Sequence, residues 1–283
     1  MFSSFSTSNA NRHPLTTGEL EAAAPSIFAS RAMEGVSSRY TYLPTSQIVD
    51  RMRQAGWLPV HAEEQRVRLP GRMGFQKHVI RFQMQGQQAL AKGEYMPEIC
   101  LINSHDACSA YQLHAALFRL VCGNGLMVSD STFEHVSIRH SGLEVQEVIT
   151  ASARVLDEVP RIAENVEMFR SRRLTPTESR AFAESAILLR WDDLQTAPIG
   201  PEKLLAPRRN EDAGNDLWTT YNRIQENLTK GGQKDYGRRK QDGHRHARSR
   251  AVSGLDENVR LNKSLWHLAE ALRQNNLPTV GAN

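Results

Sequence analysis

The stretch that decides the fold is residues 78–102, HVIRFQMQGQQALAKGEYMPEICLI. Apolar and polar residues alternate over 78–84 and again over 95–102, and the glycine-bearing segment GQQALAKG separates the two runs. Alternation with a period of two on both sides of such a gap is typical of antiparallel strands joined by a turn. Shorter runs at 67–69 and 133–142 have the same pattern. The sequence therefore predicts a small antiparallel sheet.

A different spacing follows directly after residue 102. Leu113, Ala116, Leu117, Leu120 and Val121 recur at the intervals of one helix face. Glycines at 123 and 125 then supply a stop. We therefore expect a buried helix over about 113–122.

Helical spacing also flanks the sheet and fills the second half of the chain. In the first half, Thr45 is placed to cap a helix that Gly56 ends. In the second half, Thr175, Pro176 and Glu178 have the pattern of a capping box with proline at the first helical position. The expected helices cover 45–55, 145–169 with a bend at Pro160, 175–191, 217–228 and 255–273.

These elements predict an α+β fold, a small antiparallel sheet backed by helices with a helical C-terminal half. Residues 1–38 are rich in small polar residues and predict a flexible N-terminal arm, with one short helix near 17–24. Residues 39–195 form the expected α+β core domain. A proline-bearing linker opens the helical C-terminal region, 196–283.

The composition is that of an ordinary soluble protein, with 40% hydrophobic and 23% charged residues among 283. Its apolar runs are too short to cross a bilayer, and the N-terminus lacks the pattern of a signal peptide, so we expect a cytoplasmic protein without membrane contact. Cys100, Cys108 and Cys122 lack the CxxC spacing of zinc or redox sites. We expect packed free thiols, no metal and no cofactor.

Asn103, Ser104, His105 and Asp106 form a polar cluster between the last strand of this region and the expected helix. The simpler interpretation is local: Ser104 or Asp106 caps the helix, and Asn103 closes a turn. The catalytic interpretation makes His105 a general base oriented by Asp106, or makes both residues ligands of a divalent cation, with His140 as a further candidate. Because adjacent side chains usually point apart, the local interpretation is favoured.

The most informative segment is residues 230–250, KGGQKDYGRRKQDGHRHARSR. It contains eight basic and two acidic residues, a net charge of +6 in a chain whose total is +4. We expect a flexible basic loop. Its cations can neutralise phosphates, and its tyrosine can stack on the bases of a single strand. The candidate nucleic-acid-binding residues are Lys234, Tyr236, Arg238, Arg239, Lys240, Arg245, Arg248 and Arg250. A solvated loop without a dedicated ligand remains the alternative.

Several motifs together resemble one family. They are NSHD (103–106), FRLVCGNGLMV (118–128), LWTTYNRIQENLTKGG (217–232) and RSRAVSGLDENVRLNKSLWHLAE (248–270). Their combination and order are similar to the phage- and plasmid-associated family known as domain of unknown function 932. The resemblance covers about residues 40–272 and implies an origin in a mobile genetic element. It implies no particular reaction, so no catalytic residue is transferred.

The leading expectation is a non-enzymatic nucleic-acid-binding accessory protein of a mobile element that favours single-stranded DNA, in handling or annealing. One alternative is a metal-dependent nuclease or hydrolase that uses His105 and Asp106. Another is a protein-binding factor that counters a host defence through an acidic partner of the basic segment. The sequence leaves the oligomeric state open, a homo-oligomer included.

Overall fold

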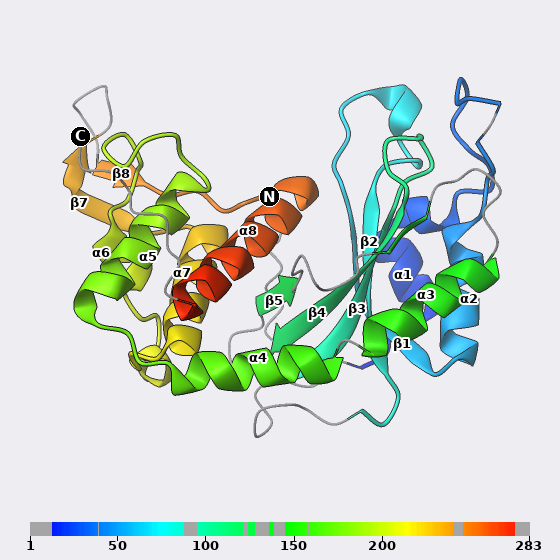
Figure 1. Cartoon of the computed structure of the whole chain (residues 1–283). Coiled ribbons are helices and arrows are strands. Elements are labelled where there is room, and N and C mark those ends of the chain that lie inside the picture. Colours follow the sequence, from blue (N-terminus) through cyan, green and yellow to red (C-terminus); the bar gives the residue numbers. More distant parts are fainter. Residues whose placement is uncertain are drawn as a thin grey trace. The chain divides into compact units, whose positions relative to one another are not determined.

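A computed structural model describes residues 13–38, 40–87, 95–120, 124–127, 136–138, 145–157, 159–239 and 246–274. The chain divides between Pro160 and Arg161 into two compact units, which we call the N-terminal and C-terminal units (Figure 1). A sheet characterises the first and helices the second, which confirms the predicted α+β class. Within the described residues, no helix combines the length and apolar character that a membrane span requires.

The N-terminal unit is built on an antiparallel sheet. Strands β1 (Trp57–Glu64), β2 (His78–Met84), β3 (Tyr95–Asn103) and β4 (Tyr111–Arg119) pair in chain order. Strands β5 (Asn124–Met127) and β6 (Val136–Ile138) both pair with β4. The structure thus confirms the strands predicted at 78–84 and 95–102 and retains a short part of the one predicted at 133–142.

Strand β4 corrects the helix predicted over 113–122. Tyr111–Arg119 pairs with β3 along its length, for example Leu113 with Leu101. Almost every described side chain of β4 is buried, including Leu113, Ala116 and Leu117. Apolar residues at nearly every position also satisfy helical spacing, and alanine and leucine favour a helix. Pairing with β3 outweighed that local preference.

Three helices pack on one face of this sheet: α1 (Thr17–Ala23), α2 (Thr45–Gln54) and α3 (Val145–Asp157) (Figure 1). Helix α1 and the 3-10 turn η1 (Pro25–Phe28) lie within the segment predicted to be a flexible arm. Leu20, Ala24 and Ile27 are fully buried there, so residues 17–28 of that segment pack into the core. The short helix predicted near 17–24 is confirmed.

The strand predicted at 67–69 is absent from the described residues. Residues 65–77 instead form the β1–β2 loop, which contains the 3-10 turn η2 (Pro70–Arg72). Strand β1 begins earlier, at Trp57, directly after the turn that follows α2. Pro70 and Gly71 interrupt strand pairing, so the alternating residues 67–69 lie in a loop and not in a strand.

The C-terminal unit is mainly helical. Its helices are α4 (Val159–Ser171), which begins at the division, α5 (Pro176–Leu188), α6 (Pro201–Leu205), α7 (Leu217–Lys230) and α8 (Leu255–Arg273), with the 3-10 turn η3 (Asn210–Asp212). The capping box predicted at Thr175 and Glu178 is present. Trp218 stacks on Tyr221, and Trp266 meets both rings edge-on in the core.

The proline-bearing linker is part of this unit and not a boundary. Ile199 and Leu204 are fully buried in it. The division predicted near residue 195 therefore falls inside the C-terminal unit. The described part of residues 230–250 is likewise more ordered than the expected loop: β7 (Lys234–Arg239) and β8 (His246–Arg248) form a two-stranded antiparallel sheet. We call residues 230–250 the basic hairpin.

Candidate nucleic-acid interface

The basic hairpin presents three of its cations to solvent. Lys234 begins β7, Arg248 ends β8 opposite it, and Arg250 follows; all three are exposed. Tyr236, Arg238 and Arg239 lie on β7. Lys240 and Arg245 lie outside the described residues. The strand pairing therefore brings Lys234 and Arg248, separated in the sequence, to one end of the ribbon.

Two charges of this segment are used within the protein. Lys230 Nζ lies 2.9 Å from Glu226 Oε1, and the Lys230 side chain is only 16% exposed. Asp235 Oδ2 accepts a hydrogen bond of 2.9 Å from the backbone N–H of Gly200. One acid and one base are thus removed from the exposed charge, and the hairpin remains strongly basic.

Backbone hydrogen bonds close the base of the hairpin. The N–H of Gly232 donates to the Ser249 carbonyl at 2.9 Å, and the N–H of Ser249 donates to the Gln233 carbonyl at 3.0 Å. The N–H of Val252 reaches the Thr229 carbonyl in α7 at 2.8 Å. These hydrogen bonds therefore fix the base of the hairpin at the C-terminal end of α7.

Gly231 is required at that point. It has φ +59° and ψ −148°, a region that essentially only glycine adopts. A Cβ there would lie 2.4 Å from the carbonyl carbon and oxygen of Arg250. Helix α7 ends at Lys230 with Gly231 as its C-cap, and the close approach of the returning strand explains why glycine is needed.

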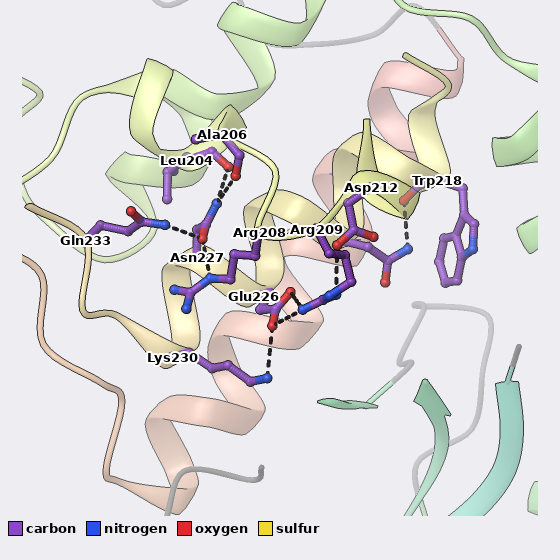
Figure 2. A network of polar contacts seen from close by, with 11 residues as sticks. Leu204, Ala206, Arg208, Arg209, Asp212, Trp218, Glu226, Asn227, Lys230 and Gln233 are labelled. Carbon is purple, nitrogen blue, oxygen red and sulfur yellow. Dashed lines mark hydrogen bonds and ion pairs between the residues drawn. The ribbon is translucent and has the colours of Figure 1, made fainter. Parts of the chain in front are cut away.

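Asn227, fully buried on α7, connects the hairpin base to the linker (Figure 2). Its Nδ2 donates to the carbonyls of Lys203, Leu204 and Ala206 at 3.2, 2.9 and 2.9 Å. Its Oδ1 accepts from Arg208 Nε and Gln233 Nε2, both at 2.6 Å. One amide thus holds the linker, Arg208 and the first residue before β7 together.

A charged cluster lies beside Asn227, between α7 and the 3-10 turn η3 (Figure 2). Arg209 Nη2 contacts both oxygens of Glu226 at 2.7 and 2.8 Å, and Arg209 Nη1 contacts Asp212 Oδ2 at 2.7 Å. Burial by itself raises the pKa of Glu226, but hydrogen bonds from Arg209 and Lys230 outweigh it and hold the pKa below its ordinary value. Glu226 therefore stays ionised at neutral pH, and its contacts with Arg209 and Lys230 fix the end of α7.

Two further arginines, neither of them a candidate site residue from the sequence, also hold the base of the hairpin. Arg208 Nη2 donates to the Gly231 carbonyl at 2.7 Å. Arg190 donates from Nη2 to the Arg250 carbonyl at 2.8 Å and from Nη1 to the Leu228 carbonyl. Their carbonyl partners lie 23, 60 and 38 positions away in the chain, so no local pattern marks them.

The polar cluster around His105 lies in the N-terminal unit, fully buried. The Thr45 hydroxyl is its centre, 3.0 Å from His78 Nε2, 3.1 Å from His105 Nε2 and 2.9 Å from Asn103 Nδ2. Thr45 is the first residue of α2 and not its cap, which is Pro44. The predicted helix is confirmed, but its expected capping residue has another role.

The hydrogen bonds assign the tautomers of the two histidines. His78 Nδ1 lies 3.0 Å from the Ser26 hydroxyl and 3.2 Å from the Gln76 carbonyl. Because the carbonyl only accepts, we assign the proton to Nδ1, and Nε2 then accepts from the Thr45 hydroxyl. His105 Nε2 must then donate to the same hydroxyl. Burial and the neighbouring His105 lower the pKa of His78 to about 3. The His78 ring is therefore uncharged at neutral pH.

Asp106 does not orient the His105 ring in this arrangement. Its Oδ1 accepts from the Cys108 N–H at 3.0 Å, and its Oδ2 lies 3.9 Å from Arg72 Nη1 in the β1–β2 loop. The His105 backbone N–H donates to the Phe75 carbonyl of the same loop at 2.9 Å. Both residues thus hold the β1–β2 loop.

Ser104 and Asn103 also differ from the expected capping roles, because a strand follows them. Ser104 Oγ accepts from the Ser109 N–H at 3.0 Å. His140 lies outside the described residues, among which no group of three His, Cys, Asp or Glu side chains is placed to hold a metal ion. Cys100 is buried, as predicted, whereas Cys108 is exposed.

Comparison with known proteins gives the family. A model described as a domain of unknown function (DUF932) matches residues 32–266. Two proteins of Escherichia coli strain K12 are similar: UPF0380 protein YafZ is 42% identical and UPF0380 protein YfjQ 41% identical, each over 259 residues and 92% of both chains. No solved structure matches. The chain, including its sheet and its basic hairpin, belongs to the DUF932 family that its central and C-terminal motifs resemble.

Proposed function

We propose that the protein binds nucleic acid through the basic hairpin. The observation that carries the proposal is the exposure of Lys234, Arg248 and Arg250 on a two-stranded ribbon whose base is closed by backbone hydrogen bonds. Lys and Arg side chains neutralise phosphates without reading sequence. A fixed base reduces the entropy that is lost when such side chains settle on a phosphate chain.

Because the basic hairpin is a two-stranded ribbon, duplex DNA joins single-stranded DNA as an expected ligand. Tyr236 on β7 favours a single strand, because an aromatic ring can stack on unpaired bases. A two-stranded ribbon also has the width that the major groove of duplex DNA admits. The proposal therefore includes both forms, and single-stranded DNA handling in a mobile element stays a prediction within it.

The test is fluorescence anisotropy with labelled single-stranded and duplex DNA over a series of salt concentrations. The variant replaces Lys234, Arg248 and Arg250 with Gln. Each phosphate contact contributes roughly 0.7 to 0.9 to the slope of log affinity against log salt, so we expect the slope to fall by about 2 to 3.

The matched control replaces Arg154, Arg161 and Arg173 with Gln, three exposed arginines outside the hairpin. It loses the same charge, and we expect its salt slope to stay that of the wild type. Absence of wild-type binding at low salt would refute the proposal. Equal slopes for the hairpin variant and the control would refute the assignment to the hairpin.

A further inference from the structure

We infer that the β1–β2 loop, residues 65–77, is a second nucleic-acid contact, in which Leu69 and Met73 insert against the bases while Arg68 and Arg72 hold the backbone. The inference rests on the proposed function, since it names a further contact with the same class of ligand. It concerns the N-terminal unit, whereas the basic hairpin belongs to the C-terminal unit.

The loop exposes apolar side chains to an unusual degree. Leu69 is 63% exposed and Met73 64% exposed, against 41% for Met168 and 39% for Leu188, the other exposed large apolar side chains among the described residues. Pro70 between them is also exposed. Leu, Met and Pro are among the side chains that DNA-bending proteins insert between base steps.

The charged residues of the loop itself are all basic, and Asp106 of the neighbouring segment faces Arg72 at 3.9 Å. Arg66, Arg68, Arg72 and Lys77 lie between residues 65 and 77, and the segment contains no Asp or Glu. Arg68 is exposed, and the Arg72 side chain is 43% exposed. The guanidinium fork matches phosphate oxygens in pairs and can stack on bases, which suits nucleic acid better than a diffuse anionic surface.

The loop is held in place although its tip is exposed. The Gln65 N–H donates to the Lys77 carbonyl at 2.7 Å, and Gln76 Nε2 donates to Glu64 Oε1 at 2.5 Å. Inside the loop, the N–H groups of Arg72 and Met73 donate to the carbonyls of Leu69 and Pro70. His105 and Asp106 contact it from the neighbouring segment, as described above. Leu69 and Met73 are thus presented on an ordered turn.

A membrane surface is the competing anionic partner. Interfacial binding relies on a long amphipathic helix that buries a wide apolar face. The loop offers only two large apolar side chains, Leu69 and Met73, which flank a 3-10 turn of three residues, Pro70–Arg72. Insertion between bases needs only such a narrow wedge, so nucleic acid is the better fit.

The experiment uses the full chain with DNA that carries 2-aminopurine, whose fluorescence rises when its neighbours unstack. The variant combines Leu69→Ala and Met73→Ala. The matched control combines Leu188→Ala and Met168→Ala, the other exposed leucine and methionine in the described part of the chain. We expect wild type and control to raise the fluorescence of duplex and purine-rich single strands, and the loop variant to abolish the rise while it still binds.

A second variant, Arg68→Gln with Arg72→Gln, tests the backbone contacts. We expect its salt slope to fall by roughly 1.4 to 1.8, two phosphate contacts at about 0.7 to 0.9 each. An unchanged slope together with an unchanged fluorescence rise in the Leu69 and Met73 variant overturns the inference, even if the hairpin variant confirms the proposed function. Absence of all DNA binding overturns the proposed function itself.

Vesicles with and without phosphatidylserine provide the remaining arm. Sedimentation of wild type with anionic vesicles, lost in the Leu69 and Met73 variant while its 2-aminopurine signal stays that of the wild type, overturns the inference in favour of a membrane partner. We expect no sedimentation that depends on these two residues. Thermal denaturation of every variant is the control for folding. Because the replaced side chains are exposed, we expect each variant to fold as the wild type does.

Discussion

Two buried polar clusters hold the two basic segments, and they do so with different chemistry. In the C-terminal unit, Asn227 and the ionised group of Arg209, Asp212, Glu226 and Lys230 fix the base of the hairpin. In the N-terminal unit, a neutral cluster centred on the Thr45 hydroxyl includes His105, whose backbone holds the β1–β2 loop. The contrast shows that a segment can be presented rigidly either by matched charges or by neutral groups.

The two solutions differ in what they tolerate. Opposite charges satisfy one another, and the exposure of Arg209 and Lys230 at 22% and 16% lets water assist. The Thr45 cluster must keep the buried His78 uncharged beside one hydroxyl, which has one proton to donate. We therefore expect the first cluster to resist acid and the second to be sensitive to it.

The largest expected effect is that of Asn227→Ala. The change leaves three carbonyls, Arg208 Nε and Gln233 Nε2 without their amide partner, and we expect the free energy of unfolding to fall by about 3 kcal/mol. Asn222→Ala on the same helix removes one bond, to the Trp218 carbonyl, and we expect a loss of about 1 kcal/mol. Urea denaturation measures both, and equal losses would contradict the role given to Asn227.

The corresponding change in the neutral cluster is Thr45→Val, which keeps the shape of the side chain and removes the hydroxyl. His78, Asn103 and His105 then lose a shared partner at full burial, and we expect a loss of about 2.5 kcal/mol. Thr45→Ser retains the hydroxyl and serves as the control, with an expected loss below about 1 kcal/mol. Similar denaturation curves for the two variants would show that the hydroxyl is not the centre of the cluster.

We expect acid to destabilise the N-terminal unit more than the C-terminal unit. The pKa of His78 is lowered from its usual 6.5 to about 3, first by burial and then by His105. The unfolded chain therefore binds a proton below about pH 6.5 that the folded chain does not, so stability is lost as pH falls from about 6.5 towards 3. The loss at pH 5 is about 2 kcal/mol. Glu226, whose pKa is lowered, contributes stability that is present above its usual 4.5 and is lost progressively as pH falls from there through its lowered pKa.

Pulsed hydrogen exchange along a urea series at pH 7 and pH 5, read separately on peptides of each unit, measures this difference. We expect the N-terminal peptides to lose protection at pH 5 at lower urea, and the C-terminal peptides to change much less. His78→Gln removes the titrating group and should flatten the pH dependence of the N-terminal unit. An equal loss in that variant would assign the acid sensitivity to another residue.

Local signals predicted the elements that local contacts decide. The capping box of Thr175 and Glu178 involves residues three positions apart and is found as predicted. Strand β4 was missed because its pairing with β3, not its own spacing, decides its conformation. The charge of the hairpin could be predicted from composition, but its order could not. Arg208 and Arg190 hold its base from 23 and 60 positions away. The Thr45 hydroxyl likewise meets groups 33, 58 and 60 positions distant.

The smallest expected effect distinguishes the two interpretations of His105 and Asp106. Asp106→Asn retains an oxygen for the Cys108 N–H and removes only the charge that faces Arg72 at 3.9 Å. That ion pair is partly exposed, so we expect a loss of about 0.5 kcal/mol or less in thermal denaturation. Asp106→Ala also removes the turn hydrogen bond and should cost about 1 kcal/mol more. If Asp106 instead orients His105 for catalysis, the Asn variant folds normally yet loses a cleavage of DNA that requires a divalent ion. If the Thr45 hydroxyl instead holds the His105 ring, we expect Asp106→Asn to lower stability only slightly and to abolish no such cleavage.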